Sequence, residues 1–148
     1  MAVVLPSEHV KDYLVTKGYT FGGTDNWALY IGKQPENPDR VITIYDSGGL
    51  APDPKWTLLY PSVQLRIRGD QQGYKDTALE ARKLRDYLIG VPSYTASNTD
   101  RIVSITGIGD IAHTGWDDKN RPDFVFNLRM IIEEDATPET NREELPIT

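Results

Sequence analysis

Apolar and polar residues alternate most regularly between Ser62 and Gly69, where the sequence reads SVQLRIRG. Val63, Leu65 and Ile67 fall on one face of the predicted strand, because successive side chains of a strand point to opposite sides of a sheet. A longer alternation from Phe124 to Ile132 predicts a second strand. Shorter stretches of β-branched or alternating apolar residues predict strands at 27–31, 40–45 and 101–108.

Two segments have the apolar spacing of a helix instead. The first begins near Ser7, a suitable N-cap residue, and ends at about Lys17, just before Gly18. The second runs from Tyr74 to Ile89. Its apolar stripe consists of Ala78, Ala81, Leu84, Tyr87 and Leu88.

The order helix, strands, helix, strands predicts an α+β fold, with a mixed or antiparallel sheet and two helices packed on one face. The other face of this sheet is predicted to be half polar, with Gln64, Arg66, Arg68, Asn127 and Arg129. In a monomer such a face is solvated. In an oligomer it can form an interface or line a channel.

The chain is expected to form one domain followed by an acidic tail. Its 148 residues are enough to bury a sizeable core. The net charge is −6, and six acidic residues and one basic residue lie between Glu133 and Thr148. We therefore predict a single α+β domain over residues 1–133 and a disordered acidic tail over residues 134–148.

The composition excludes several kinds of site. The chain has no cysteine, which excludes a disulfide scaffold, a cysteine-ligated zinc site and a thiol nucleophile. The N-terminal sequence MAVVLPSEHV lacks the basic and long apolar segments of a signal peptide, and no stretch has the length of a membrane span. We therefore expect no membrane partner.

The sequence IYDSGGLAP, from Ile44 to Pro52, is similar to short catalytic loops of two enzyme classes, the aspartic proteases and the chymotrypsin-like serine proteases. An aspartic protease needs two paired copies of an Asp-Ser-Gly loop on a nearly all-β fold, whereas this chain has one copy and a strong central helix. A serine protease needs a histidine base, and neither His9 nor His113 lies in a recognisable base motif. The favoured interpretation is that Asp46 and Ser47 cap the strand end and that the two glycines adopt positive φ.

No metal or cofactor site is predicted. His113, Asp117 and Asp118 are close in sequence, but they match neither a zinc nor a calcium motif. Neither a dinucleotide-binding glycine loop nor a Walker motif is present. Arg66 and Arg68 share a strand face without an aromatic residue between them, so a stacking groove for nucleic acid is not predicted.

Several segments, taken in order, resemble the tail terminator or minor capsid proteins of long-tailed bacteriophages. The resemblance covers residues 5–133. It rests on a strand that runs into Asp-Ser-Gly-Gly, a Pro-x-x-Gln-x-x-x-Arg strand, and a late Asp followed by Arg, an aromatic residue and Asn. The matching residues are Asp46, Ser47, Gly48 and Gly49; Pro61, Gln64 and Arg68; and Asp117, Arg121, Phe124 and Asn127. The chain departs from the pattern at Trp116, where a smaller or aliphatic residue is expected.

The resemblance implies a structural protein without enzymatic activity or cofactor. It implies a ring of usually six subunits that caps the tail tube, stops its polymerisation and offers a surface to the head connector. The expected partners are other copies, the tail tube protein and a head-completion or connector protein, with DNA only passing through the ring. The expected location is the head–tail junction of the virion, after assembly in the host cytoplasm. The candidate interface residues are Asp46, Gly48, Gly49, Leu50, Trp56, Arg66, Arg68, Asp117, Arg121 and Arg129.

Two other functions remain open at this point. One is a head-completion or connector adaptor of the virion, and the other is a small hydrolase that uses Asp46 or Ser47. The segment Asp46–Pro61 is predicted to be a long loop that clamps a neighbouring subunit, with Trp56 as its main anchor. The alternative is that this segment folds back on its own sheet and that Trp56 belongs to the core.

Overall fold

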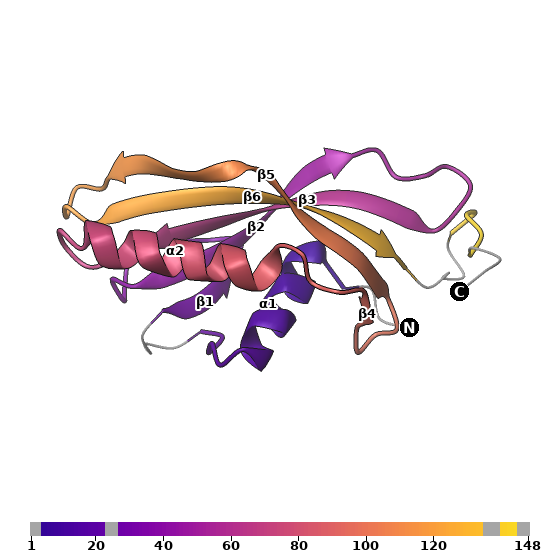
Figure 1. The fold of residues 1–148 in the computed structure, drawn as a ribbon, viewed down its shortest axis with the longest axis horizontal. Helices are drawn as coiled ribbons and strands as arrows, with labels where there is room; N and C mark the ends of the chain where they lie inside the picture. Colours follow the sequence, from indigo (N-terminus) through magenta and orange to yellow (C-terminus); the bar gives the residue numbers. More distant parts are fainter. Residues whose placement is uncertain (1–3, 23–26, 135–139, 145–148) are drawn as a thin grey trace.

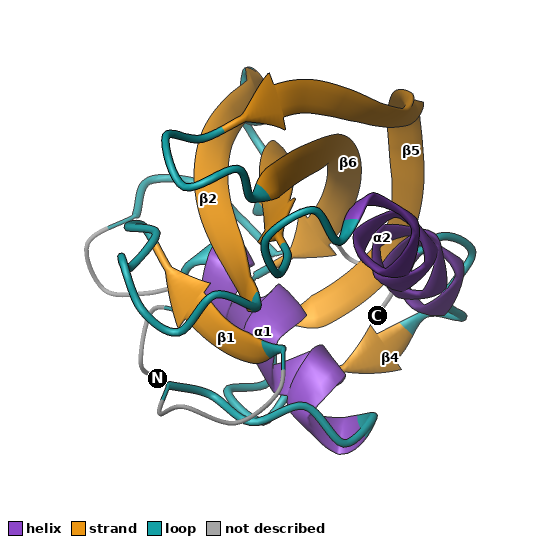
Figure 2. Cartoon of the chain, turned by 90° about the vertical axis from the view of Figure 1, so that its left-hand side faces the viewer, coloured by secondary structure: helices purple, strands orange, loops and turns teal. Residues whose placement is uncertain are grey.

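The computed structural model describes residues 4–22, 27–134 and 140–144. Within them, two helices and six strands form an α+β fold in which the strands make one curled, mixed sheet (Figures 1 and 2). The elements are α1 (Pro6–Thr16), β1 (Ala28–Ile31), β2 (Val41–Leu50), β3 (Leu58–Arg68), α2 (Tyr74–Leu88), β4 (Tyr94–Thr95), β5 (Arg101–Trp116) and β6 (Pro122–Glu133). The predicted α+β class and mixed sheet are therefore confirmed.

The sheet has the strand order β1-β2-β3-β6-β5-β4. β1 is parallel to β2, and all other neighbouring strands are antiparallel. The two strands with the clearest alternation in sequence, β3 and β6, pair with each other in the centre of the sheet. Their alternation fits antiparallel strands that bury one row of side chains and leave the other row on a more polar face.

Both helices contribute to one buried cluster. Val10 and Leu14 of α1 and Leu84 and Leu88 of α2 have no exposed surface and pack with the apolar rows of β2, β3, β5 and β6. Burial of one such side chain contributes about 1.5–3 kcal/mol relative to its exposure. The structure thus shows two helices in a common core; the narrower expectation that both pack on one face of the sheet stays a prediction.

The prediction of a long loop over Asp46–Pro61 is wrong. β2 continues to Leu50 and β3 begins at Leu58, so that only residues 51–57 are irregular. The strand continues because a β-bulge between Asp46 and Gly49 absorbs the glycines, which weaken a regular strand but fit a bulge.

Two smaller predictions also need correction, and one strand was not predicted. Leu5, not Ser7, is the N-cap of α1, and Ser7 lies inside the helix. β5 extends to Trp116, beyond the predicted end at Ile108, so that His113 lies on a strand; bulges along the pairing of β5 with β6 accommodate its glycines. The short strand β4 was not predicted, because two residues carry no periodic signal. No helix in the described part of the chain combines the length and apolar character needed to cross a membrane.

Candidate functional site

The ends of β2 and β3 form a hairpin that extends beyond the helices at one end of the molecule (Figure 1). We call residues 46–61 the hairpin arm. Gly49 lies at its bulge with a φ of +105°, and a Cβ atom there would lie 2.4 Å from the carbonyl oxygen of Tyr60 and 2.6 Å from the backbone nitrogen of Ser62. Only glycine fits this position. The Asp-Ser-Gly-Gly sequence therefore shapes a β-bulge.

Asp46 binds the first turn of α1. The backbone N–H and the hydroxyl of Ser7 donate to its two carboxylate oxygens, at 2.9 and 2.7 Å. An acid at a helix N-terminus accepts free N–H groups and interacts favourably with the helix dipole. His9 pairs with Asp100 at 3.0 Å, and neither histidine forms a hydrogen bond with Ser47 among the described residues. Asp46 thus links the arm to the helix.

The tip of the arm, residues 51–57, is held by hydrogen bonds within the arm and by backbone hydrogen bonds with Glu134 and Glu143. The N–H of Asp53 donates to the carbonyl of Leu58 at 3.0 Å, and the carboxylate of Asp53 accepts the N–H groups of Lys55 and Trp56 at 2.8 Å each. These two hydrogen bonds lower the pKa of Asp53 below its usual range. The tip is therefore an ordered turn, and Leu50 beside it is 56% exposed.

Trp56 is partly buried. The ammonium of Lys55 lies 4.7 Å from the centre of its ring, and its backbone forms a β-bridge with Glu143. Residues 135–139 and 145–148 of the predicted disordered tail lie outside the described residues. Trp56 as an anchor for a neighbour stays a prediction.

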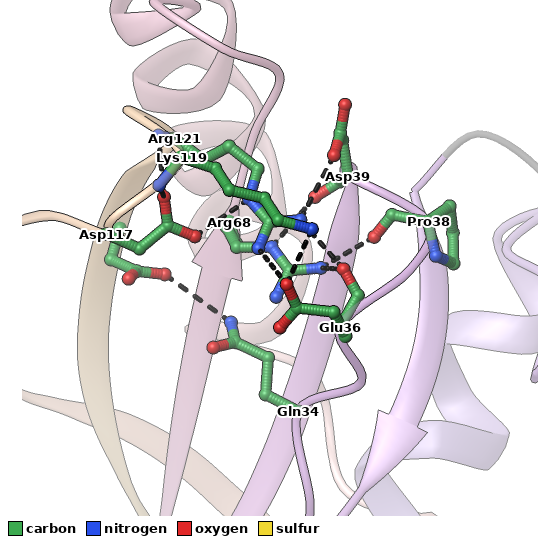
Figure 3. Close-up of polar contacts among 9 residues, drawn as sticks. Gln34, Glu36, Pro38, Asp39, Arg68, Asp117, Lys119 and Arg121 are labelled. Atoms are coloured by element: carbon green, nitrogen blue, oxygen red, sulfur yellow. Dashed lines mark hydrogen bonds and ion pairs between the residues drawn. The ribbon is translucent and has the colours of Figure 1, made fainter.

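Two buried arginines bind the loop 32–40 between β1 and β2 (Figure 3). Arg68 donates to the carbonyl oxygens of Pro38 at 2.6 Å, Asp39 at 3.1 Å and Glu36 at 3.2 Å. Burial lowers the pKa of Arg68, and the neighbouring charge of Arg121 lowers it further.

Arg121 joins the same loop to the turn between β5 and β6. Its guanidinium donates to the carboxylate of Asp117 at 2.7 Å, to the carbonyl of Glu36 at 2.8 Å and to the carboxylate of Asp39 at 3.0 Å. Burial alone would raise the pKa of Asp117, but hydrogen bonds from the backbone and side chain of Arg121 lower it overall. We call Arg68, Arg121 and Asp117 the arginine cluster; its contacts stabilise the subunit itself, and a role in an interface stays a prediction.

The predicted half-polar face exists on β3 and β6. Gln64 donates to Asn127 across the two strands at 3.3 Å. Arg66 is partly buried and Arg129 is exposed. The structure therefore brings Arg66 and Arg129 to one face, and Arg129 pairs with Ser62 at the base of the hairpin arm.

An aromatic cluster was not predicted. Tyr74 of α2, His113 and Trp116 of β5 and Phe124 of β6 pack together, with ring centres 5.0–6.2 Å apart. No pattern in the sequence predicts this cluster, because its members come from three elements that the fold brings together. His113 therefore contacts aromatic rings, and in the described part of the chain no group of three or more His, Asp or Glu side chains is placed to hold a metal ion.

The comparison with protein families agrees with the resemblance. The family model described as bacteriophage tail terminator protein matches residues 13–134, which include both central strands, the hairpin arm and the arginine cluster. No curated protein matches the chain. The predicted family is confirmed: the chain belongs to the bacteriophage tail terminator proteins.

Proposed function

We propose that this chain is the subunit of a ring that caps the tail tube, stops its polymerisation and joins the tail to the head connector. The family is a structural one and not an enzyme family, and it places the protein in the virion tail. The head–tail junction, a ring of six and assembly in the host cytoplasm belong to the proposal.

The hairpin arm is the observation that carries the proposal. It is ordered by its own hydrogen bonds and by backbone hydrogen bonds with Glu134 and Glu143, yet it presents Leu50 to solvent and keeps Trp56 only partly buried. An ordered, projecting segment with apolar side chains loses little conformational freedom when it binds. Such a segment suits contact with a neighbouring subunit, with Trp56 and Leu50 as anchors.

The half-polar sheet face is suited to let DNA pass without recognition of its sequence. Arg66 and Arg129 are the cations of this face that reach solvent, whereas Arg68 is buried by its own loop. Two accessible cations are few for a DNA-binding surface, since affinity depends on the number of phosphates neutralised. We therefore assign DNA a transient role, as it passes through the ring.

The test is tail morphology. A phage that lacks this gene should make overlong tails, and the parent gene supplied in trans should restore the normal length. Loss of a head-connector adaptor would instead give tails of normal length without heads, and that result would favour the alternative. A Ser47→Ala variant should restore tail length fully; failure of a folded variant would revive the hydrolase.

The arm can be tested in the same assay with matched leucines. Leu50 on the arm and Leu79 on α2 are 56% and 53% exposed. We expect Leu50→Asp to leave tails overlong and Leu79→Asp to restore their length, because only the first places a charge in the proposed contact. Equal behaviour of the two folded variants would remove the arm from the proposal.

A further inference from the structure

The aromatic cluster forms a second surface suited to a partner. Tyr74 and Trp116 are 46% and 48% exposed, although both are large aromatic residues. His113 lies against both rings at 5.0 and 5.5 Å, and Phe124 lies 5.0 Å from Tyr74 and from His113. We call these four residues the aromatic shelf. Aromatic side chains with accessible faces are the commonest anchors of interfaces.

The shelf is held rigidly and is hollowed at its rim. The backbone N–H of Gln72 donates to the carbonyl of Asn120 at 2.8 Å, which ties the start of α2 to the turn after β5. Gln72, Asn120 and Trp116 line a hollow of about 310 Å³. The exposed amides beside the indole are able to donate to carbonyl groups of an extended segment.

The tip of the hairpin arm has the complementary chemistry. Its sequence Ala51-Pro52-Asp53-Pro54 contains two exposed prolines. Each proline fixes its own φ and keeps the preceding residue extended, so that the segment favours a polyproline-type conformation. Proline-rich segments of this kind dock on aromatic surfaces, because the flat rings stack and little chain entropy is lost.

The tip and the shelf lie at opposite ends of the long axis of the molecule. In Figure 1 the turn between β2 and β3 is at the right-hand end, and the end of β5, the start of β6 and the start of α2 are at the left-hand end. The tip therefore cannot reach the shelf of its own chain. A contact between two different surfaces of identical subunits is head-to-tail, and such contacts generate closed rings when the rotation between subunits closes.

We propose that the aromatic shelf of one subunit receives residues 51–54 of the hairpin arm of a neighbouring copy. This inference rests on the proposed ring. It gives a role to Trp116, the residue at which the chain departs from the family pattern. The bulky indole supplies the surface on which the prolines of the neighbour stack.

The absence of cysteine from the chain allows a direct test by disulfide mapping. Ala51→Cys places one thiol on the exposed tip, and Gln71→Cys places another beside the hollow. The two single variants are purified separately, mixed, and oxidised mildly in solution and on tails from a phage that lacks the gene. We expect a cross-linked pair from the mixture and none from either variant alone. Val15→Cys, exposed on α1, mixed with Ala51→Cys is the matched control and should not cross-link.

The outcomes separate this inference from the function. Rings or capped tails without the cross-link overturn the inference and leave the proposed function intact, whereas overlong tails that the parent protein fails to shorten overturn the function. A cross-link from Gln71→Cys alone means that two shelves face each other, which also overturns the inference. A tail tube protein cross-linked to Gln71→Cys in place of a second copy does the same.

Substitutions test how much the indole and the prolines contribute to association between subunits. Trp116→Ala should weaken association about tenfold or more, with little change in thermal stability because its ring is half exposed. The double substitution of Pro52 and Pro54 by serine should weaken association in the same direction from the other side of the contact. Phe21→Ala, which removes a similarly exposed ring elsewhere, is the control and should assemble as the parent does. Normal assembly of either folded contact variant overturns the inference.

Discussion

Arg121 offers the sharpest test of how this subunit is held together. Its side chain is almost completely buried, and it donates to groups of both the β5–β6 turn and the loop 32–40. Arg121→Ala removes charge-assisted hydrogen bonds to Asp117 and Asp39 and one hydrogen bond to the carbonyl of Glu36. It also leaves a space where the guanidinium was.

The expected loss of stability depends on how well water can replace Arg121 at the groups that it binds. Loss of one member of a buried ion pair costs about 3–5 kcal/mol, since the remaining charge stays uncompensated. Here the side chains of Asp117 and Asp39 are 21% and 45% exposed, so that water replaces part of what they lose. We therefore expect destabilisation of about 3 kcal/mol. For a domain of this size that is a fall in Tm of roughly 6–12 °C.

The assay is urea unfolding of purified protein, with thermal unfolding as a second measure. Arg121→Lys keeps the charge but not the planar fork, and we expect it to lose about half as much stability. Arg129→Ala removes an exposed arginine and should change stability by about 0.5 kcal/mol or less. A loss below about 1 kcal/mol for Arg121→Ala, with weakened assembly, would refute the structural explanation and make Arg121 an interface residue.

Four further predictions follow from the arm, the arginine cluster and the tail. Gly49→Ala should destabilise by about 2 kcal/mol or more and Gly48→Ala by about 1, because both glycines have positive φ but only Gly49 faces backbone atoms; equal effects in urea unfolding would contradict this. Asp117→Asn should lower Tm at pH 7, and the difference from the parent should shrink as the pH falls below about 4, since the lowered pKa of Asp117 adds stability only while its carboxyl is ionised; a constant difference between pH 3 and 7 would exclude it. Truncation after Glu134 should leave the fold intact and lower Tm by only a few degrees, because residues 140–144 contribute two backbone hydrogen bonds from Glu143 to the arm and an ion pair of Arg142 with Glu134, and none of them belongs to the core cluster; unfolding of the truncated chain would refute it. Trp56→Ala should stay folded by circular dichroism and yet weaken ring formation or tube capping about tenfold, and normal capping would exclude Trp56 as an anchor.

The elements that the sequence predicted best are those in which local pattern and final environment agree. Val63, Leu65 and Ile67 alternate in sequence and are fully buried in the structure, because a central strand sees the core on one side along its whole length. The helix predicted at 74–89 ends one residue earlier, at Leu88. In both cases the apolar period alone contains the needed information.

The prediction failed where the decisive contact comes from a distant part of the chain. Glycines at 48 and 49 argue against a strand, and only the partner strand shows that they form a bulge. From the sequence alone we expect Arg68 and Arg121 to be surface cations, yet the loop around Pro38 covers both. Burial of a charged side chain depends on three-dimensional partners, which a single sequence does not display.

The arginine cluster and the aromatic shelf are also physically linked, and this decides how variants must be interpreted. Arg121 follows Asn120 directly, and its bonds to Asp117 close the turn that begins just after Trp116. If Arg121 is removed, the turn loses its anchor and the indole loses its fixed position. Weaker assembly of Arg121→Ala together with a lower Tm would then report a disordered shelf and would not indicate direct contact between Arg121 and a neighbour. Trp116→Ala changes the surface without touching the anchor. The two variants should therefore differ in Tm while both assemble poorly, and that combination separates a residue that positions the surface from one that forms it.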